Sequence, residues 1–485
     1  MSQFTLQSIS KIHEAFEKKQ LSSVELTRSY LAAIRASQHN AYLTVCEERA
    51  LKQAKFADEL IAREGRILRE KFPLLGIPLG IKDNLVVDGV RTTCGSKILE
   101  NYHPPYTATC VSRLEAAGAV ALGKLNMDEF AMGGSNENSA YGGVKHPTHS
   151  DRVPGGSSGG SAAAVGAGLC VAALGSDTGG SIRLPASYCG IVGIKPTYGR
   201  VSRFGLVAFA SSLDQVGPMA KSVEDAALLL DVLSGHDPMD STSDLRPQTA
   251  CFKATQNTPD WSQLRIGIPH EYFIGGLSPE VEKSIQESIR FFEKKGAKLV
   301  PISLPHTQYS VAIYYLVAVS EASSNLARFD GVRYGVRPLH VDQDLVSFYK
   351  KVRAGFGSEV KRRIILGTFA LSAGYSEAYY RRACQVRHLV KQDFDQAFQK
   401  VDLILGPVSP TTAYKVGEKA SDPLQMYLND IFTIPANLAG IPAMSLPCGQ
   451  DKDGLSIGLH LMAPQFAEER LLSVAQAFEK GRTSA

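Results

Sequence analysis

Two serines in the stretch 155–185 have the setting that a nucleophile needs. Ser157 lies in one glycine-rich loop and Ser181 in a second, and the segment between the loops, 162–174, is almost wholly apolar. Glycine lets backbone N–H groups approach a ligand closely, so paired loops of this kind are typical of a site made largely of main chain. A flexible Gly/Ser linker would lack the apolar centre. We therefore expect a buried helix that fixes the separation of two functional loops.

Three kinds of chemistry compete for these serines. Residues 155–159 satisfy the G-x-S-x-G pattern of a hydrolase nucleophile elbow, but that elbow needs a strand directly before it, and the preceding residues are polar and end in proline. A phosphate cradle would need G-x-G-x-x-G or G-K-[ST], which the stretch lacks. The third interpretation takes Ser181 as the nucleophile. Its main-chain N–H and those of the residues before it could form an oxyanion hole: Thr178, Gly179 and Gly180.

A serine nucleophile also needs a base, and no histidine lies within 30 residues of Ser181. Lys82 lies inside the apolar segment 74–87, which is predicted to be a buried strand interrupted by Gly and Pro. A charged lysine is costly to bury, so this side chain either extends to water or has its pKa lowered toward neutrality. Extension to water is the commoner outcome, whereas a neutral Lys82 could act as the base.

An α/β framework is predicted to position these groups. Segments 265–269, 278–295 and 297–303 have the strand, helix, strand order of a right-handed crossover with parallel strands. Alternation of strands and helices along the chain favours one large unit over 1–485, a mixed central β-sheet covered by helices on both faces. Further strands are expected at 401–407, 437–448 and 455–463, a helix at 222–234, and a closing helix at 467–480.

The chain is expected to divide into four consecutive parts. Residues 1–70 are predicted to form a helical layer, in which Ser22 and Glu25 have the spacing of a capping box. Residues 71–235 carry the lysine and serines, and 264–485 complete the fold. Between them, 236–263 is polar and contains prolines, so it is the best candidate for a linker.

Composition excludes several classes of protein. The chain is 44% hydrophobic and 21% charged, as in ordinary globular proteins, and a net charge of +4 is too weak to indicate nucleic-acid binding. Eight scattered cysteines without a C-x-x-C pair argue against zinc and for a reducing compartment. There is no apolar run long enough for a membrane span. We expect a cytoplasmic protein without a metal or an ATP site, because the near P-loop at 118–125 has a strand pattern between its glycines and lacks the Ser or Thr that holds magnesium.

The stretch GGSSGGSAAAVGAGLCVAALGSDTGGSIRLPA resembles the amidase signature throughout, and GIPLGIKDN around Lys82 resembles the lysine-bearing strand of the same superfamily. The resemblance implies the amidase-signature fold and a Ser-Ser-Lys triad. Ser181 would be the acyl-forming nucleophile, Ser157 the bridging proton carrier and Lys82 the base. It also implies a cis peptide between Gly156 and Ser157.

Asp177 and Arg183 also fit the signature. For these two residues, ordinary ion pairing that holds the loop is the simpler expectation.

Four other segments resemble the family of A subunits of bacterial glutamyl-tRNA(Gln) amidotransferases: 195–218, 320–335, 359–375 and 422–443. In that family an arginine holds the substrate α-carboxylate, corresponding to Arg363, and an aspartate holds the α-amino group, corresponding to Asp430. Tyr314 is expected to add a hydroxyl to the pocket. A fixed cation and a fixed anion would select a zwitterionic amino acid such as glutamine over a simple amide.

The family resemblance implies a glutaminase without a cofactor of its own. Ammonia would pass to a partner B subunit, which uses ATP and magnesium to amidate Glu-tRNA(Gln) or Asp-tRNA(Asn), and a small C subunit would complete a heterotrimer. A stand-alone amidase acting on another amide is the main alternative. A scaffold protein without catalysis is the alternative from another class.

Overall fold

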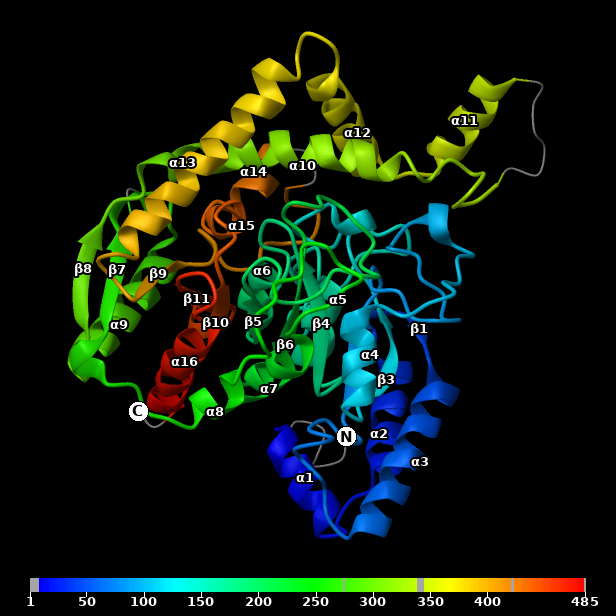
Figure 1. Ribbon diagram of the computed structural model, residues 1–485, viewed down its shortest axis with the longest axis vertical. Coiled ribbons are helices and arrows are strands. Elements are labelled where there is room, and N and C mark those ends of the chain that lie inside the picture. The colour runs from blue at the N-terminus through cyan, green and yellow to red at the C-terminus, as the bar shows by residue number, and fades with distance from the viewer. Residues whose placement is uncertain (1–7, 274, 338–343, 420–422, 484–485) are drawn as a thin grey trace.

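One eleven-stranded β-sheet forms the centre of the computed structural model, which describes residues 8–273, 275–337, 344–419 and 423–483 (Figure 1). The strands lie in the order β1-β3-β2-β4-β6-β5-β10-β11-β9-β7-β8. Their bounds are β1 Tyr42–Val45, β2 Pro78–Lys82, β3 Val120–Leu125, β4 Ala172–Asp177, β5 Val192–Lys195, β6 Gln215–Ala220, β7 Arg265–Pro269, β8 Lys298–Ile302, β9 Leu403–Pro407, β10 Ala443–Gln450 and β11 Ser456–Met462.

The sheet is mixed, as predicted. Strand β2 lies parallel to β3 and β4, and β7 lies parallel to β8 and β9. The other strand pairs are antiparallel, including the hairpin of β10 and β11. The predicted crossover over 265–303 is confirmed, since a helix connects the parallel strands β7 and β8.

Sixteen α-helices are present in the described residues, and the predicted capping box is formed by Ser22 and Glu25. Their bounds are α1 Ile9–Glu17, α2 Ser23–Ala36, α3 Glu47–Glu64, α4 Thr109–Ala116, α5 Gly159–Gly166, α6 Arg183–Cys189, α7 Val223–Leu233, α8 Cys251–Thr255, α9 Pro279–Lys295, α10 Ser310–Leu326, α11 Leu345–Ala354, α12 Ser358–Leu371, α13 Arg382–Ala397, α14 Pro423–Leu428, α15 Ile434–Leu438 and α16 Glu468–Thr483.

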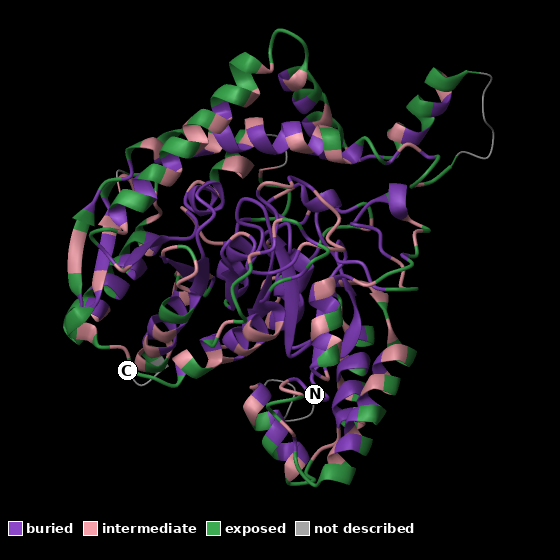
Figure 2. Cartoon of the chain, in the orientation of Figure 1, coloured by how far each residue is buried: buried purple, intermediate pink, exposed green. Residues whose placement is uncertain are grey.

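Helices cover both faces of the sheet. In β9, Leu403 and Leu405 belong to the hydrophobic core that includes α9 and α16, whereas Ile404 between them belongs to the core that includes α10 and α13. Successive side chains of a strand point to opposite faces, so these are two cores on opposite sides. Figure 2 shows the inner strands buried between them, whereas the edge strands β1 and β8 carry intermediate and exposed residues.

Four expectations differ from the structure. Of the expected strand 437–448, the first two residues belong to α15, and β10 begins only at Ala443. Residues 1–70 are not wholly helical, because β1 lies within them and pairs with β3. Only 78–82 of the expected strand 74–87 is a strand. The apolar segment 162–174 is not one helix, because α5 ends at Gly166 and β4 begins at Ala172. Gly168 has a φ of 69°, a left-handed conformation that commonly follows the end of a helix.

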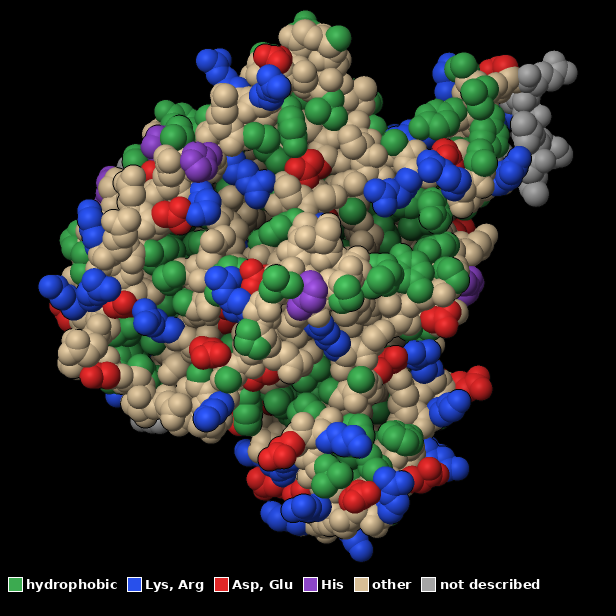
Figure 3. Space-filling view, viewed as in Figure 1, with side chains coloured by type: hydrophobic (Ala, Val, Ile, Leu, Met, Phe, Trp, Pro, Cys, Tyr) green, Lys and Arg blue, Asp and Glu red, His purple; other side chains and the backbone are tan. Residues whose placement is uncertain are grey.

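The predicted linker, 236–263, contains α8 and the short 3₁₀ turn Trp261–Gln263. Helix α8 contacts α7 and α16, and its Cys251 is buried. Lys and Arg are interspersed with Asp and Glu on the face in Figure 3, in keeping with the small net charge. In the described part of the chain, no helix has the length and apolar character to cross a membrane.

A buried ion pair beside β2 gives a stability prediction. Lys124 Nζ lies 3.0 Å from Asp83 Oδ1, and both side chains are buried. Replacing Lys124 by Met leaves a carboxylate buried without its cation, which should lower the free energy of unfolding by about 3–5 kcal/mol. The measurement is the urea midpoint of unfolding. Lys55→Met, at an exposed pair with Glu59, is the matched control and should leave the midpoint unchanged. Equal midpoints for both variants would contradict the prediction.

Candidate active site

The predicted base and the two serine loops lie at the carboxyl ends of two neighbouring strands. Strands β2 and β4 are parallel neighbours, so their carboxyl ends meet on the same side of the sheet. Lys82 is the last residue of β2, and the loop after β4 leads to Ser181. The loop before α5 carries Ser157, and Ser158 N donates to Ser181 O at 3.2 Å. The sequence-distant groups are thus brought together by strand pairing.

Lys82 is fully buried and its Nζ contacts three hydroxyls. The partners are Ser157 Oγ at 2.8 Å, Ser158 Oγ at 2.8 Å and Ser176 Oγ at 2.9 Å. Of the two alternatives for Lys82, extension to water is therefore wrong, and burial of the amine is what the structure has. Ser158 and Ser176 were missed, although both lie within the signature stretch. They could have been found by asking which acceptors a buried ammonium group needs.

Burial lowers the pKa of Lys82 to about 7. The negative charges of Asp128, Asp177 and Asp214 act in the other direction and limit this decrease. None of these carboxylates hydrogen-bonds to Nζ in the described residues. A substantial fraction of neutral amine is therefore present at physiological pH, which is what a general base requires.

The two serines differ in exposure and in partners. Ser157 is completely buried, whereas Ser181 keeps 8% of its surface exposed. Among the described residues, Ser157 Oγ hydrogen-bonds to Lys82, and no hydrogen bond joins it to Ser181 Oγ. The peptide between Gly156 and Ser157 is cis, as the family resemblance implied. Lys82 is thus hydrogen-bonded to Ser157, and Ser181 is the serine that is partly exposed.

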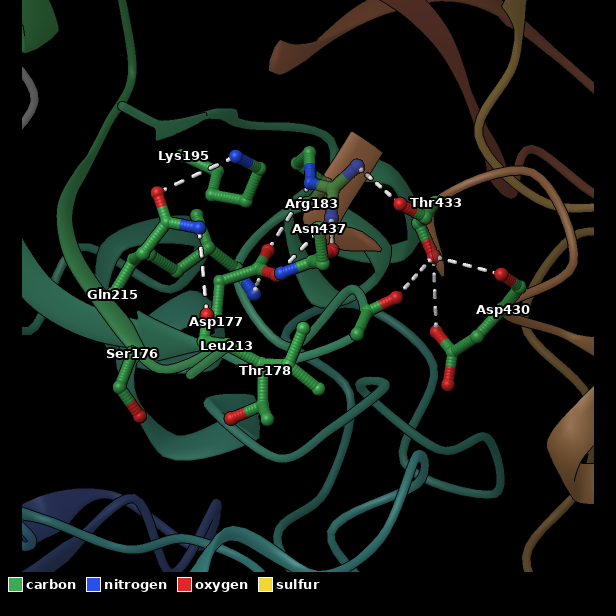
Figure 4. A network of polar contacts seen from close by, with 12 residues as sticks. Ser176, Asp177, Thr178, Arg183, Lys195, Leu213, Gln215, Asp430, Thr433 and Asn437 are labelled. Carbon is green, nitrogen blue, oxygen red and sulfur yellow. Dashed lines mark hydrogen bonds and ion pairs between the residues drawn. The ribbon is translucent and has the colours of Figure 1, made fainter. Parts of the chain in front are cut away.

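An ion pair holds the second loop, as expected for Asp177 and Arg183. Both side chains are wholly buried, with Arg183 Nη2 3.0 Å from Asp177 Oδ1 (Figure 4). Although burial opposes ionisation, the charge of Arg183 lowers the pKa of Asp177 to about 2. Asp177 Oδ2 also accepts from Ile182 N at 3.1 Å. The loop between β4 and α6 is therefore fixed at both ends.

Two of the predicted recognition residues lie against the glycines of this loop. A Cβ added to Gly179 would lie 2.7 Å from the ring of Tyr314, which is on α10. A Cβ added to Gly180 would lie 2.5 Å from Asp430 Oδ1, which follows α14. A side chain at either position would need space that is already occupied, by Tyr314 at Gly179 and by Asp430 and Thr433 at Gly180.

Arg363 is buried on α12 among aromatic rings. Its guanidinium lies 5.2 Å from the Tyr315 ring centre and 5.4 Å from that of Tyr427. Its Nε donates to Glu359 Oε1 at 2.8 Å, and the Tyr427 hydroxyl donates to the same oxygen at 2.7 Å. The three partners were missed, although Glu359 and Arg363 have the i, i+4 spacing of a helical ion pair.

Asp430 and Arg363 act on each other electrostatically. Burial and the nearby Asp177 carboxylate raise the pKa of Asp430 to about 8, and the charges of Arg183 and Arg363 oppose the rise. Asp430 and Tyr314 thus lie beside the loop that ends at Ser181, and Arg363 is near enough for its charge to act on both side chains. Across the described residues, no group of three or more His, Cys, Asp or Glu side chains is placed to hold a metal ion.

The family model for amidases matches residues 25–472, a range that contains every predicted site residue. The chain belongs to the amidase family. A protein of Carboxydothermus hydrogenoformans, named as the A subunit of glutamyl-tRNA(Gln) amidotransferase, is 55% identical over 478 residues, covering 98% of this chain and 96% of the relative. It follows that this chain is an amidohydrolase.

Solved structures of this amidase family agree with the fold. The A subunit of the glutamyl-tRNA(Gln) amidotransferase of Thermotoga maritima is 42% identical, with a TM-score of 0.79, and the match covers 99% of this chain and 96% of that one. The peptide amidase of Stenotrophomonas maltophilia is 31% identical, with a TM-score of 0.82 over 99% and 97% of the two chains. The amidase-signature fold predicted from the sequence is confirmed.

The environment of Lys82 predicts the pH dependence of amide hydrolysis. Because the neutral amine is the active form, kcat/KM should rise about tenfold per pH unit up to about pH 7 and then level off. The measurement is kcat/KM for a simple amide from about pH 5.5 to about pH 8.5. A profile that stays flat down to the lowest pH would contradict a role for Lys82 as base.

Proposed function

We propose that this chain is the glutaminase component of a tRNA-dependent amidotransferase. Its close full-length relatives are named as the A subunit of glutamyl-tRNA(Gln) amidotransferase, and they share more than half of their residues with it. Glutamine would be the ammonia donor, and glutamate the second product.

The observation that carries the substrate is the position of the recognition groups. Asp430 and Tyr314 press against the two glycines before Ser181, and Arg363 lies close enough to act on the Asp430 pKa. A guanidinium and a carboxylate match the α-carboxylate and the α-ammonium of an amino acid. Burial raises the pKa of Asp430 to about 8, and an α-ammonium group bound beside it would lower that pKa again and favour the carboxylate. The side-chain amide of glutamine would then extend to the nucleophile.

The first chemical step would be acyl transfer to Ser181. Neutral Lys82 takes the proton of the Ser157 hydroxyl while Ser157 takes that of Ser181, and Ser181 Oγ attacks the side-chain carbonyl of glutamine. Main-chain N–H groups of 178–181 stabilise the tetrahedral oxyanion. When the C–N bond breaks, the proton returns through Ser157 to the leaving nitrogen, so that ammonia and a glutamyl-enzyme are formed.

Water completes the reaction. It attacks the glutamyl ester while the same lysine and serine accept its proton, and collapse of the intermediate returns a proton to Ser181 Oγ and releases glutamate. The chain ends in its starting state, with one amide bond hydrolysed and no cofactor needed in this component.

The ammonia would be used by a partner. We propose a cytoplasmic heterotrimer with a B and a C subunit. The B subunit binds ATP and magnesium and amidates Glu-tRNA(Gln), and Asp-tRNA(Asn) as a further substrate. The small net charge of this chain fits a component that does not grip tRNA itself.

A stand-alone amidase remains the second candidate, because solved relatives include a peptide amidase at 31% identity. The charged pair Arg363 and Asp430 favours an amino-acid substrate instead. A scaffold without catalysis is disfavoured, because the contact between Lys82 and Ser157 has the geometry of a working base.

Replacement of Ser181 tests the nucleophile. Ser181→Ala should lower glutamine hydrolysis by several orders of magnitude, about 10³-fold or more, because the acyl-enzyme cannot form. The assay is ammonia release by the chain together with its partner subunits. Ser161→Ala is the control from the same stretch, since that hydroxyl donates to Leu174 O and has no contact with Lys82. Activity of Ser181→Ala within a few-fold of the parent would reject the nucleophile.

Replacement of Arg363 tests the substrate. Arg363→Ala should raise the KM for glutamine about 100-fold, because a charge-assisted contact is lost, while hydrolysis of a simple amide changes far less. Lys361→Ala is the control, an exposed cation on the same helix. An equal loss on both substrates would mean that Arg363 is structural.

A further inference from the structure

Thr433 is a buried residue whose hydroxyl contacts both the oxyanion loop and a recognition residue. Its Oγ1 donates to Gly179 O at 2.7 Å and lies 3.4 Å from Asp430 Oδ1 (Figure 4). Neither the resemblance nor the sequence pattern singles out this position. It lies between α14 and α15, more than 250 residues after the loop that it contacts.

The peptide that joins Gly179 to Gly180 needs such a contact. A peptide unit is planar, so its C=O and N–H point in opposite directions. Fixing Gly179 O on one side therefore aims Gly180 N–H to the other side, where the oxyanion hole is proposed. Glycine has the widest choice of backbone conformations, so a peptide between two glycines rotates readily unless it is held.

Thr433 is itself held in place. Its main-chain O accepts from Arg183 Nη1 at 2.9 Å, and its N donates to Asp430 O at 3.0 Å. Arg183 also pairs with Asp177, the last residue of β4. Thr433 is therefore connected through Arg183 to the end of this strand.

We propose that Thr433 is a positioning residue that aims Gly180 N–H into the oxyanion hole and ties that loop to Asp430. The inference deepens the proposed function and rests on it for the identity of the substrate. The effect on the oxyanion applies to any amide that Ser181 attacks, because the tetrahedral intermediate is the same.

The test compares Thr433→Val, which removes the hydroxyl at nearly constant shape, with Thr433→Ser, which keeps it. The full chain is assayed on glutamine, with its partner subunits, and on a simple amide. Thr433→Val should lower kcat about tenfold on both substrates and leave KM within about threefold. Without the hydroxyl, Gly180 N–H is no longer held in place, and its hydrogen bond to the oxyanion in the transition state is lost. Thr433→Ser should stay within about threefold of the parent. Circular dichroism reports folding, and Thr433→Ala replaces the valine variant if that variant does not fold.

An unchanged kcat for the valine variant would overturn the inference. A loss confined to the KM for glutamine would do so as well, because Thr433 would then act only through Asp430. A serine variant as slow as the valine variant would assign the effect to packing. If the parent hydrolyses the simple amide but not glutamine, the proposed function fails, while the kcat comparison on the simple amide still decides the role of Thr433.

Discussion

The site depends on a lysine that is buried without an ion pair. Lys124 and Arg183 are equally buried, but each has a carboxylate at about hydrogen-bond distance, Asp83 and Asp177 respectively. Lys82 has hydroxyls instead. Desolvation without a compensating charge favours the neutral amine. The type of the neighbouring acceptors thus distinguishes Lys82 from Lys124 and Arg183.

A second constraint is the limited space around Gly179 and Gly180 in the loop before Ser181. In the proposed mechanism, the loop before Ser181 has to expose main-chain N–H groups and also leave room for side chains from the second half of the chain. Glycine at 179 and 180 meets both needs, because the volume of a missing Cβ is taken by Tyr314 and Asp430. The proposed recognition residues and the proposed oxyanion hole are therefore in direct contact.

The sequence predicts local features of this molecule better than its long-range contacts. Periodicity located α7, α9 and the crossover over 265–303, because each signal lies within one segment. The resemblance supplied Lys82, Ser157 and Ser181. Strand order and the contacts of Thr433 were not predictable, because they join residues whose proximity arises only when distant strands pair. The pair of Glu359 and Arg363 lies within one helix, and its i, i+4 spacing could have revealed it. The prediction of one helix over the apolar segment 162–174 was wrong, because a buried helix and a buried strand have similar sequence patterns over short runs.

The place of the final hairpin bears on how the protein is synthesised. Strands β10 and β11 are last in the chain but lie in the middle of the sheet, joining β5 to β9. While the ribosome makes the roughly 250 residues between β5 and β10, the outer edge of β5 waits unpaired for about 10–50 s at usual elongation rates. Open strand edges invite association with other chains. A nascent chain of this protein is therefore most exposed to aggregation just before its last strands emerge, and chaperone binding would matter most at that point.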